Sequence, residues 1–541
     1  MPEEFDYIVV GAGAAGCVLA ERLSANPAVR VALIEAGRGD RHPLHAFPML
    51  TGYYYRRKSD NWFFNTVPQK ALNDRTSFWP RGKRLGGSSI FNGMVYARGN
   101  AGDYNQWAQL GNTGWSYEDV LPYFKKNERH VNGESELHGG DGLVDVTPAR
   151  PKNPLTQAFV QAGIQAGYRS IDDLNGPDVA GVGYYDFNMK RGRRSNSAGA
   201  LLKSLNTRKN LQLIDNALVT GIVIENGAAT GVAYVRGGEK VTLSARREVV
   251  LSAGAVGSPH ILMLSGIGNP GHLKSVGIAP VHDLNGVGQN LIDHLDAFIK
   301  MAAIGEISLL RELRVDRIVT SVARAFTLGT GPVSESPISA GGYFRSREGL
   351  EYPDLQAFFV PLIISGASVW LPYTKRAKTV AGQHGYSLRI GPIRPQSRGR
   401  ITLASPDPSA APIIDPGYLS DPEDLNATVA GLKIARRILA QKAFEPFRRE
   451  ELAPGQGVTS DAELSDYVRA TADTVYHPVG SARMGNDSMA VVDARLRVHG
   501  IRNLRVADAS IMPTISSGNT NAPTMMIAEK AADMIHQDAK R

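Results

Sequence analysis

One short segment near the carboxyl end has the residue types of a proton-transfer site. The segment "TVYHPVGSARMG", residues 474–485, places His477 between a tyrosine and a proline in a run of small residues. An imidazole has an unperturbed pKa close to neutrality and therefore suits general base catalysis. A histidine in such a loop could equally be a helix cap or a metal ligand, so the other motifs have to separate these roles.

A glycine pattern near the amino end indicates a phosphate-binding turn. Gly11, Gly13 and Gly16 form G-x-G-x-x-G between an apolar, β-rich run at Phe5–Val10 and a run typical of a helix. In this arrangement the first glycine permits a tight turn, the second lets backbone N–H groups approach a pyrophosphate, and the third lets the helix pack on the strand. The helix would then direct its positive N-terminal end at the phosphates.

The residues that follow complete a dinucleotide-binding pattern. A second apolar run, Val29–Ile34, ends at Glu35, whose carboxylate could accept both hydroxyls of an adenosine ribose. Glu35 would repel a 2′-phosphate, which disfavours NADP. The pattern does not distinguish FAD from NAD.

A second glycine-rich block, "WPRGKRLGGSSIFNGMVYARG" at 79–99, predicts a buried loop. Its Gly, Ser and Asn content disfavours a regular element, whereas its apolar residues indicate burial. A buried loop must find partners for its N–H groups, and a flavin with its pyrophosphate would supply them.

Four segments together resemble the glucose-methanol-choline (GMC) oxidoreductases, most nearly the choline-dehydrogenase-like branch of FAD alcohol dehydrogenases. The segments are "RGKRLGGSSIFNGMVYARG", "GAVGSPHILMLSGIG" (254–268), "YHPVGSARMG" and "ADASIMPTISSGNTNAPTMMIAEKAAD" (507–533). The resemblance runs from Tyr7 to about Asp533 and is weakest across 300–395. It implies an FAD enzyme that oxidises a small-molecule alcohol.

The resemblance also implies which residues hold FAD. The ADP half would lie against Gly11, Gly13, Ala14, Ala15, Gly16, Glu35, Ala36, Val219, Ala253 and Gly254. The pyrophosphate, ribityl chain and isoalloxazine would lie against Arg81, Gly86, Gly87, Ser88, Asn92, Gly93, Met94, Asp508, Ala509, Asn519 and Asn521. Choline oxidases attach FAD covalently through a histidine at the position that Phe91 occupies here. Phenylalanine has no nucleophilic nitrogen, so we expect non-covalent FAD.

The resemblance assigns the catalytic roles to His477 and Asn519. Alcohol oxidation transfers the hydroxyl proton to a base and the carbinol hydride to the flavin. His477 is the expected base, and Asn519 is expected to hold the alcohol oxygen. Asn521 lies close by in the sequence, and the sequence does not settle which of the two asparagines is nearer the substrate. "NAPTMMIAEKAADMIHQ" predicts a helix with Asn521 as N-cap, whose start would direct positive charge at the flavin. His294 and His499 are interpreted as loop residues, and no metal site is predicted.

Two other activities that occur on the same fold are alternatives to alcohol oxidation. A hydroxynitrile-lyase-like enzyme would bind FAD without using its redox chemistry. A fatty-acid photodecarboxylase would need an active-site cysteine, and Cys17, the only cysteine, follows the phosphate loop instead.

The motifs divide the chain into interleaved segments. Residues 1–153, 193–295 and 470–541 are predicted to form a discontinuous Rossmann-like FAD-binding domain, and 154–192 and 296–469 a substrate-binding domain. "GGYFRS", "DLQAFFVPLI", "YSLRIGPIRP" and "GRITLAS" predict a largely antiparallel sheet that caps the flavin, and 422–441 predicts a helix. The expected fold class is α/β (α+β), of the glucose-oxidase type.

Composition limits the partners and the location. The chain has 541 residues and a net charge of +8, but its basic residues are scattered, so nucleic-acid binding is not expected. The single cysteine fits a reducing compartment, the acidic N-terminus does not resemble a signal peptide, and no apolar run predicts a transmembrane helix. We expect a cytoplasmic protein, with peripheral attachment to an anionic membrane as the alternative. The sequence leaves open the alcohol, the oligomeric state, and whether O₂ or a quinone accepts the electrons.

Overall fold

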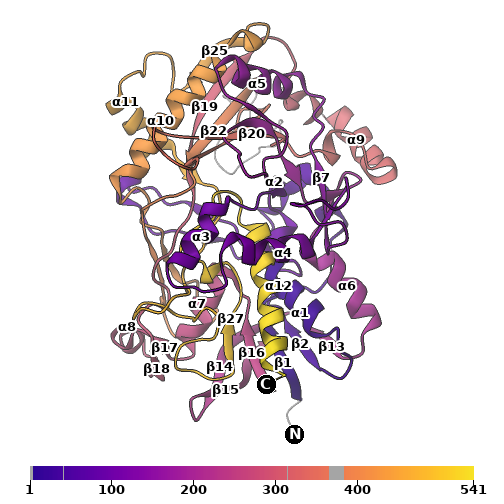
Figure 1. Cartoon of the computed structure of the whole chain (residues 1–541), viewed down its shortest axis with the longest axis vertical. Coiled ribbons are helices and arrows are strands. Elements are labelled where there is room, and N and C mark those ends of the chain that lie inside the picture. The colour runs from indigo at the N-terminus through magenta and orange to yellow at the C-terminus, as the bar shows by residue number, and fades with distance from the viewer. Residues whose placement is uncertain (1–3, 41, 314, 365–382, 541) are drawn as a thin grey trace.

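A computed structural model describes residues 4–40, 42–313, 315–364 and 383–540. Two large sheets lie at opposite ends of the long axis, and the C-terminal helix runs from the middle of the molecule toward the end where both termini lie (Figure 1). Part of the predicted substrate domain, 365–382, lies outside the described residues.

The sheet near the termini is built around β1 (Glu4–Val10). Its strand order is β13-β2-β1-β16-β15-β14, with β27 also paired to β16. The strands around β1 are parallel, whereas β14, β15 and the first half of β16 form an antiparallel meander. The bounds are β2 (Val31–Ile34), β13 (Leu211–Ile214), β14 (Ala217–Glu225), β15 (Ala228–Arg236), β16 (Glu239–Leu251) and β27 (Leu504–Val506).

The turn after β1 requires its glycines. α1 (Ala14–Leu23) begins directly after the turn. Gly11 has φ +96, and a Cβ on Gly16 would lie 1.8 Å from the Gly11 carbonyl oxygen, so only glycine permits this helix to pack so closely. The predicted strand–turn–helix unit is therefore present.

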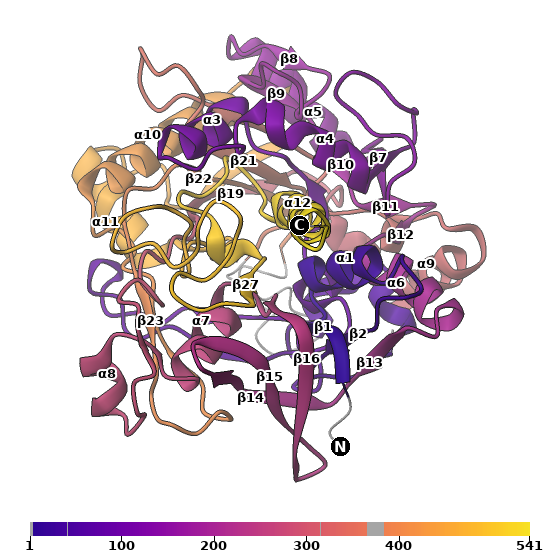
Figure 2. The ribbon, with the colours of Figure 1, turned by 60° about the horizontal axis from the view of Figure 1, so that its bottom comes forward.

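The C-terminal helix α12 (Asn521–Asp538) packs beside α1, and Figure 2 shows it almost end-on. Its buried face carries the Met525–Met526 pair, which packs in the core. The predicted N-cap was wrong by one residue. Thr520 is the N-cap and makes no side-chain cap bond, while Asn521 is the first helical residue and donates its side-chain amide to Asn188 Oδ1 at 3.3 Å.

The second large sheet is antiparallel and has the order β20-β21-β22-β19-β25, with β26 also paired to β19. Helices α5 and α10 cover it. Three of the four predicted strands are in this sheet, whereas "GRITLAS" forms β23 in a separate two-stranded sheet. The bounds are β19 (Leu295–Ala303), β20 (Ala340–Phe344), β21 (Leu355–Val360), β22 (Gly385–Pro392), β23 (Arg400–Thr402), β25 (Arg448–Ala453), β26 (Asp473–Thr474), α5 (Pro154–Gln165) and α10 (Pro422–Leu439).

A smaller sheet and several helices complete the fold. A four-stranded sheet, β5-β10-β7-β6, joins residues 95–148 to 186–187, and so pairs segments that the sequence placed in different domains. The domain boundaries stay a prediction. The bounds are β5 (Val95–Tyr96), β6 (Glu128–His130), β7 (Val144–Pro148), β10 (Asp186–Phe187), α2 (Thr51–Tyr54), α3 (Ala101–Gln109), α4 (Tyr117–Asn127), α6 (Ser197–Thr207), α7 (Gly254–Leu264), α8 (Pro270–Ser275), α9 (Val315–Leu328) and α11 (Asp461–Thr471).

Within the described ranges, no helix combines the length and the apolar character needed to cross a membrane.

Candidate functional site

A cavity of about 480 Å³ is lined by residues of both large sheets. That volume is typical of ligand and cofactor sites. Most of the predicted site residues line it: Gly11, Gly13, Ala14, Ala15, Glu35, Ala36, Arg81, Gly87, Ser88, Asn92, Gly93, Met94, Val219, Ala253, Gly254, His477, Asp508, Ala509, Asn519 and Asn521. Gly16 and Gly86 lie behind the wall, where their backbones pack against neighbouring atoms.

One end of the cavity has the features of a ribose site. Glu35 directly follows β2, and its two carboxylate oxygens accept hydrogen bonds from the backbone N–H groups of Ala12 (2.9 Å) and Gly37 (2.8 Å). Burial raises the pKa of Glu35, while these two bonds oppose that rise. The carboxylate is therefore fixed in place, and its remaining lone pairs are suited to accept ribose hydroxyls.

The middle of the cavity is formed by the two glycine-rich loops, which touch. A Cβ on Gly87 would lie 2.8 Å from the Gly13 Cα, so side chains here would push the loops apart. The N-terminus of α1 has no side-chain cap and Ala14 and Ala15 line the cavity. The unpaired N–H groups of that first turn are suited to bind a pyrophosphate.

The start of α12 lies at the other end. Its N-terminus also lacks a side-chain cap, and Asn519, Thr520 and Asn521 line the cavity there. Nearby, Asp508 accepts the Gly254 N–H at 2.8 Å and the Ser258 hydroxyl at 2.5 Å, which joins the start of α7 to the C-terminal segment. Two uncapped helix starts, a ribose-type carboxylate and a glycine cradle together fit a flavin dinucleotide.

The loop that carries His477 is fixed by Asp293, a residue that the motif search did not single out. Asp293 Oδ1 accepts the His477 N–H at 2.7 Å, and Oδ2 accepts the hydroxyls of Thr474 and Tyr418, each at 2.5 Å. Tyr476 has φ +67, an uncommon conformation for a bulky residue, and Arg81 donates to its carbonyl oxygen at 2.8 Å. The loop is thus held in one strained conformation by several hydrogen bonds.

Two side chains contact the imidazole of His477. Asn519 Nδ2 lies 3.1 Å from Nε2, and His294 Nδ1 lies 3.0 Å from Nδ1. The structure therefore places Asn519, rather than Asn521, beside His477. It also brings in His294, which the sequence analysis interpreted as an ordinary loop residue. The segment "LIDHLD" offered a weak signal, because Asp293 and His294 interrupt an otherwise apolar run at the start of β19.

Burial sets the charge state of these groups. His477 is 8% exposed, and burial lowers its pKa well below 6.5, with further lowering from His294, Arg81 and Arg389. Burial lowers the pKa of His294 to about 4 and raises that of Asp293 to about 6. Near neutral pH, both imidazoles are therefore uncharged.

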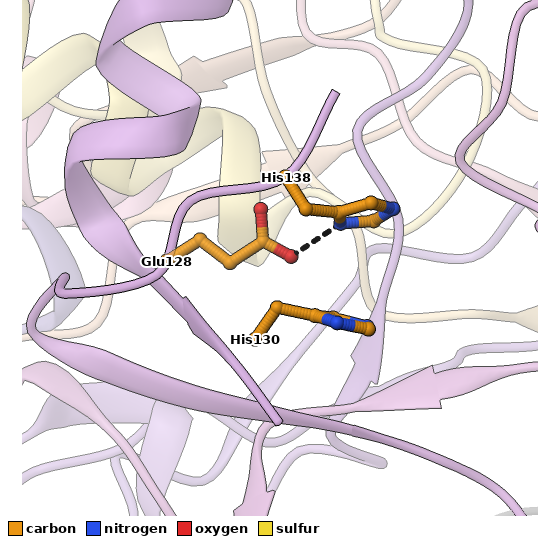
Figure 3. A group of neighbouring side chains, drawn as sticks. All are labelled: Glu128, His130 and His138. Atoms are coloured by element: carbon orange, nitrogen blue, oxygen red, sulfur yellow. Dashed lines mark hydrogen bonds and ion pairs between the residues drawn. The ribbon is translucent and has the colours of Figure 1, made fainter. Parts of the chain in front are cut away.

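Outside the cavity, the described residues bring one group of possible metal ligands together: Glu128, His130 and His138 (Figure 3). Glu128 already accepts a hydrogen bond from His138 at 2.7 Å and another from Arg98. His138 also contacts Asp173 at 3.1 Å, and these two carboxylates raise its pKa to about 9 although burial opposes the rise. A metal ion would have to displace a proton and approach a guanidinium, so we interpret the group as an ion-pair network.

The chain was compared with known proteins. Residues 5–296 and 395–528 match the two family models described as GMC oxidoreductase. An alcohol dehydrogenase [acceptor] of Pseudomonas putida is 43% identical over 98% of this chain and 95% of its own. An oxygen-dependent choline dehydrogenase of Chromohalobacter salexigens is 44% identical over 98% of this chain and 95% of its own length.

Solved structures agree with the sequence comparisons. A pyridoxine 4-oxidase from Mesorbium loti has a TM-score of 0.89 at 31% identity and covers 98% of this chain and 99% of its own. A formate oxidase structure has a TM-score of 0.92 at 26% identity, and the match covers 100% of this chain and 99% of the formate oxidase chain. The predicted fold class is therefore confirmed.

The ion-pair network predicts how stability depends on pH. The folded pKa of His138, about 9, exceeds its ordinary value of 6.5, so its contribution is complete below about 6.5 and is lost as the pH rises through about 9. We expect the difference in free energy of unfolding between wild type and His138→Gln to shrink over that interval, as measured by chemical denaturation. His499→Gln serves as the control. Stabilisation by added zinc that disappears in His138→Gln would instead show a metal site.

Proposed function

Because the chain belongs to the GMC oxidoreductase family, we propose that it oxidises a neutral, largely apolar alcohol with His477 as the base and Asn519 as the group that holds the alcohol oxygen. Its activity is FAD-dependent oxidation of an alcohol to the carbonyl compound. When bound, FAD supplies the hydride acceptor. Nothing in the comparisons favours the lyase alternative.

The observation that carries the proposal is the contact between His477 Nε2 and Asn519 Nδ2 at 3.1 Å in the cavity that also holds the dinucleotide cradle. An alcohol oxygen that replaces this contact and lies within hydrogen-bonding distance of both nitrogens would donate its proton to Nε2 and accept a hydrogen bond from the Asn519 amide. The O–H bond breaks as the N–H bond forms, and the amide stabilises the negative charge that develops on oxygen. The lowered pKa of His477 keeps the base unprotonated near neutral pH.

The substrate side of the cavity is mostly apolar. Its apolar wall from the substrate segments is formed by Phe298, Leu309, Ile338, Phe358, Val360, Leu362 and Ile364, and the polar residues of the same segments that line it are Ser336, Arg389 and Ser409. Burying an apolar alcohol against such a wall is favourable in proportion to the area removed from water. These contacts support an aliphatic or aromatic alcohol.

The charges nearby disfavour choline. A quaternary ammonium group needs aromatic faces and a carboxylate free to balance its charge. Asp296 uses both oxygens in a bidentate pair with Arg389 (2.8 and 2.9 Å), and burial raises its pKa to about 6. Burial also raises the pKa of Asp473, which lines the cavity. Residues 365–382, outside the described part, contain no Asp or Glu in their sequence.

We further propose how FAD is held and where the protein is located. Phe91 is buried on the cavity wall and offers no nucleophile, which supports dissociable FAD. The single cysteine supports a reducing compartment, and on that basis we propose a cytoplasmic location, with peripheral membrane attachment as the alternative. Parallel assays with O₂ and with a quinone or dye identify the acceptor.

Removing the base should abolish most turnover without removing the cofactor. We expect His477→Ala to retain FAD and lose about 10²–10⁴-fold in kcat, because general base catalysis contributes about that factor. Anaerobic flavin bleaching by an alcohol measures the loss, and the flavin spectrum measures FAD content. His499→Ala is the control. Turnover near that of wild type in His477→Ala would rule out the role of base.

The substrate proposal can be tested with two alcohols that differ in charge alone. Choline and its carbon isostere, in which a tert-butyl group replaces trimethylammonium, have nearly the same shape. We expect kcat/KM to favour the isostere by at least about tenfold, equivalent to about 1.4 kcal/mol of transition-state stabilisation. A preference for choline would contradict the charge argument while leaving alcohol oxidation intact.

The mode of FAD attachment has a direct readout. Acid or detergent denaturation of the yellow enzyme should release all flavin into the filtrate, because Phe91 offers no atom for a covalent bond. Ultrafiltration followed by absorbance of both fractions gives the result. Flavin that stays with the denatured chain would show covalent attachment through another residue.

A further inference from the structure

We infer that His294 is a positioning residue that holds His477 in the tautomer with its proton on Nδ1 and its lone pair on Nε2. The inference rests on the proposed role of His477 as the base and explains how that base is prepared. His294 lies between Asp293, which fixes the His477 loop, and the first residue of β19. It reaches neither cofactor nor substrate, because it does not line the cavity.

The direction of the hydrogen bonds can be assigned from a backbone carbonyl. His294 Nε2 lies 3.1 Å from the carbonyl oxygen of Ile393. A carbonyl oxygen only accepts, so His294 Nε2 must carry a proton. His294 is 2% exposed, and burial lowers its pKa to about 4, so the ring is neutral and its Nδ1 holds a lone pair.

This lone pair determines the proton position on His477. The two Nδ1 atoms are 3.0 Å apart, and the rings meet nearly edge to face, at 87°. One proton must lie between them, and His294 cannot supply it. His477 therefore donates from Nδ1, and because burial keeps this ring neutral as well, its Nε2 is left as an acceptor.

The contact on the other side of the His477 ring independently indicates that Nε2 is unprotonated. Gln356 Nε2 lies 3.4 Å from Asn519 Oδ1, which turns the Asn519 amide nitrogen toward His477 Nε2. An amide nitrogen only donates, so Nε2 must accept. Gln356 is itself oriented, because its Nε2 also lies 3.3 Å from the Tyr185 hydroxyl, which donates its own proton to the Ala357 carbonyl oxygen at 2.9 Å and so can only accept from Gln356.

The resulting order of donors runs one way, from Gln356 through Asn519, His477 and His294 to the Ile393 carbonyl. In the other tautomer, two donors would face each other at Nε2 and two lone pairs at Nδ1. The mismatch at Nδ1 would lie between two buried rings, where an unsatisfied hydrogen-bonding group is costly. The arrangement thus excludes the form of His477 that could not accept an alcohol proton.

The same bond also persists through turnover. When His477 Nε2 gains the alcohol proton, Nδ1 keeps its own proton and continues to donate to His294. The donor is then charged, which strengthens the bond. Neither ring needs to move, so the base stays aligned in both protonation states.

The tautomer can be observed directly in the FAD-loaded wild-type enzyme. Nitrogen NMR of isotope-labelled histidine distinguishes a protonated from an unprotonated ring nitrogen, and His477→Gln identifies the His477 signals by their loss. We expect Nε2 to be unprotonated and Nδ1 protonated near neutral pH. A proton on Nε2 would overturn the inference, whatever the activity of any variant.

Variants of His294 test the consequence for catalysis. His294→Leu removes the acceptor, and we expect kcat to fall by about 10- to 100-fold, the loss typical of residues that orient a metal-binding histidine. KM should change much less, because His294 does not line the cavity. His294→Asn keeps a carbonyl acceptor on its side chain and should recover most of the loss. His499→Leu, which also loses one bond to a carbonyl oxygen (Gly485, 3.0 Å), should leave kcat unchanged.

The outcomes separate this inference from the proposed function. Near-normal turnover in His477→Ala would show that His477 is not the base. If His477→Ala loses turnover but His294→Leu keeps both its kcat and the His477 spectrum of wild type, only the role of His294 would be ruled out. If His294→Leu fails to retain FAD, the tautomer seen in the wild-type spectrum and the kcat of His294→Asn still test the role of His294. An equal loss in His294→Asn and His294→Leu, with an unchanged His477 tautomer, would show that His294 acts only as structural support.

Discussion

The site depends on the buried carboxylate of Asp293. This one side chain accepts hydrogen bonds from the His477 backbone and from the hydroxyls of Thr474 and Tyr418, and so ties together three segments that are far apart in the sequence. Tyr418 in turn accepts a bond from the indole of Trp79, which extends the connection to the loop that carries the second glycine block. Because His294 immediately follows Asp293, the hydrogen bonds that fix Asp293 also fix the position of His294.

The backbone conformation at His477 follows from the same constraint. Tyr476 adopts φ +67, which a bulky residue rarely does without compensation. The compensation comes from the bonds on both sides of it, to Thr474 Oγ1 from its N–H at 2.8 Å and to its carbonyl from Arg81 at 2.8 Å. The strained turn aims the imidazole into the cavity, and losing the carboxylate of Asp293 would release the turn and the base together.

Part of this arrangement could be predicted from sequence, for identifiable reasons. The β1–α1 unit follows local rules, since Gly11 and Gly16 permit contacts that no other residue allows. The antiparallel strands of the second sheet were visible as apolar, β-rich runs. The role of Asn521 was misread, because the capping rule assumes that the side chain turns back to its own helix, whereas it contacts Asn188. His294 was missed because its significance lies in a contact with a residue 183 positions away, which neither periodicity nor a motif encodes.

Charge balance links the base to the nature of the substrate. A carboxylate against His477 Nδ1 would stabilise the imidazolium form and raise the pKa of the ring, so more of the base would already be protonated before an alcohol binds. The chain places a neutral imidazole there instead, so burial keeps His477 uncharged and its Nε2 lone pair available. The Asp296 carboxylate is likewise matched by the Arg389 guanidinium, which also lies 5.0 Å from the Phe298 ring centroid. With Asp296 already paired and the positively charged Arg389 on the wall, this part of the described cavity is poorly suited to a cationic ligand, which would also lose its hydration. A neutral alcohol carries its own proton to the base, brings no charge that needs a partner, and can use the apolar wall for binding.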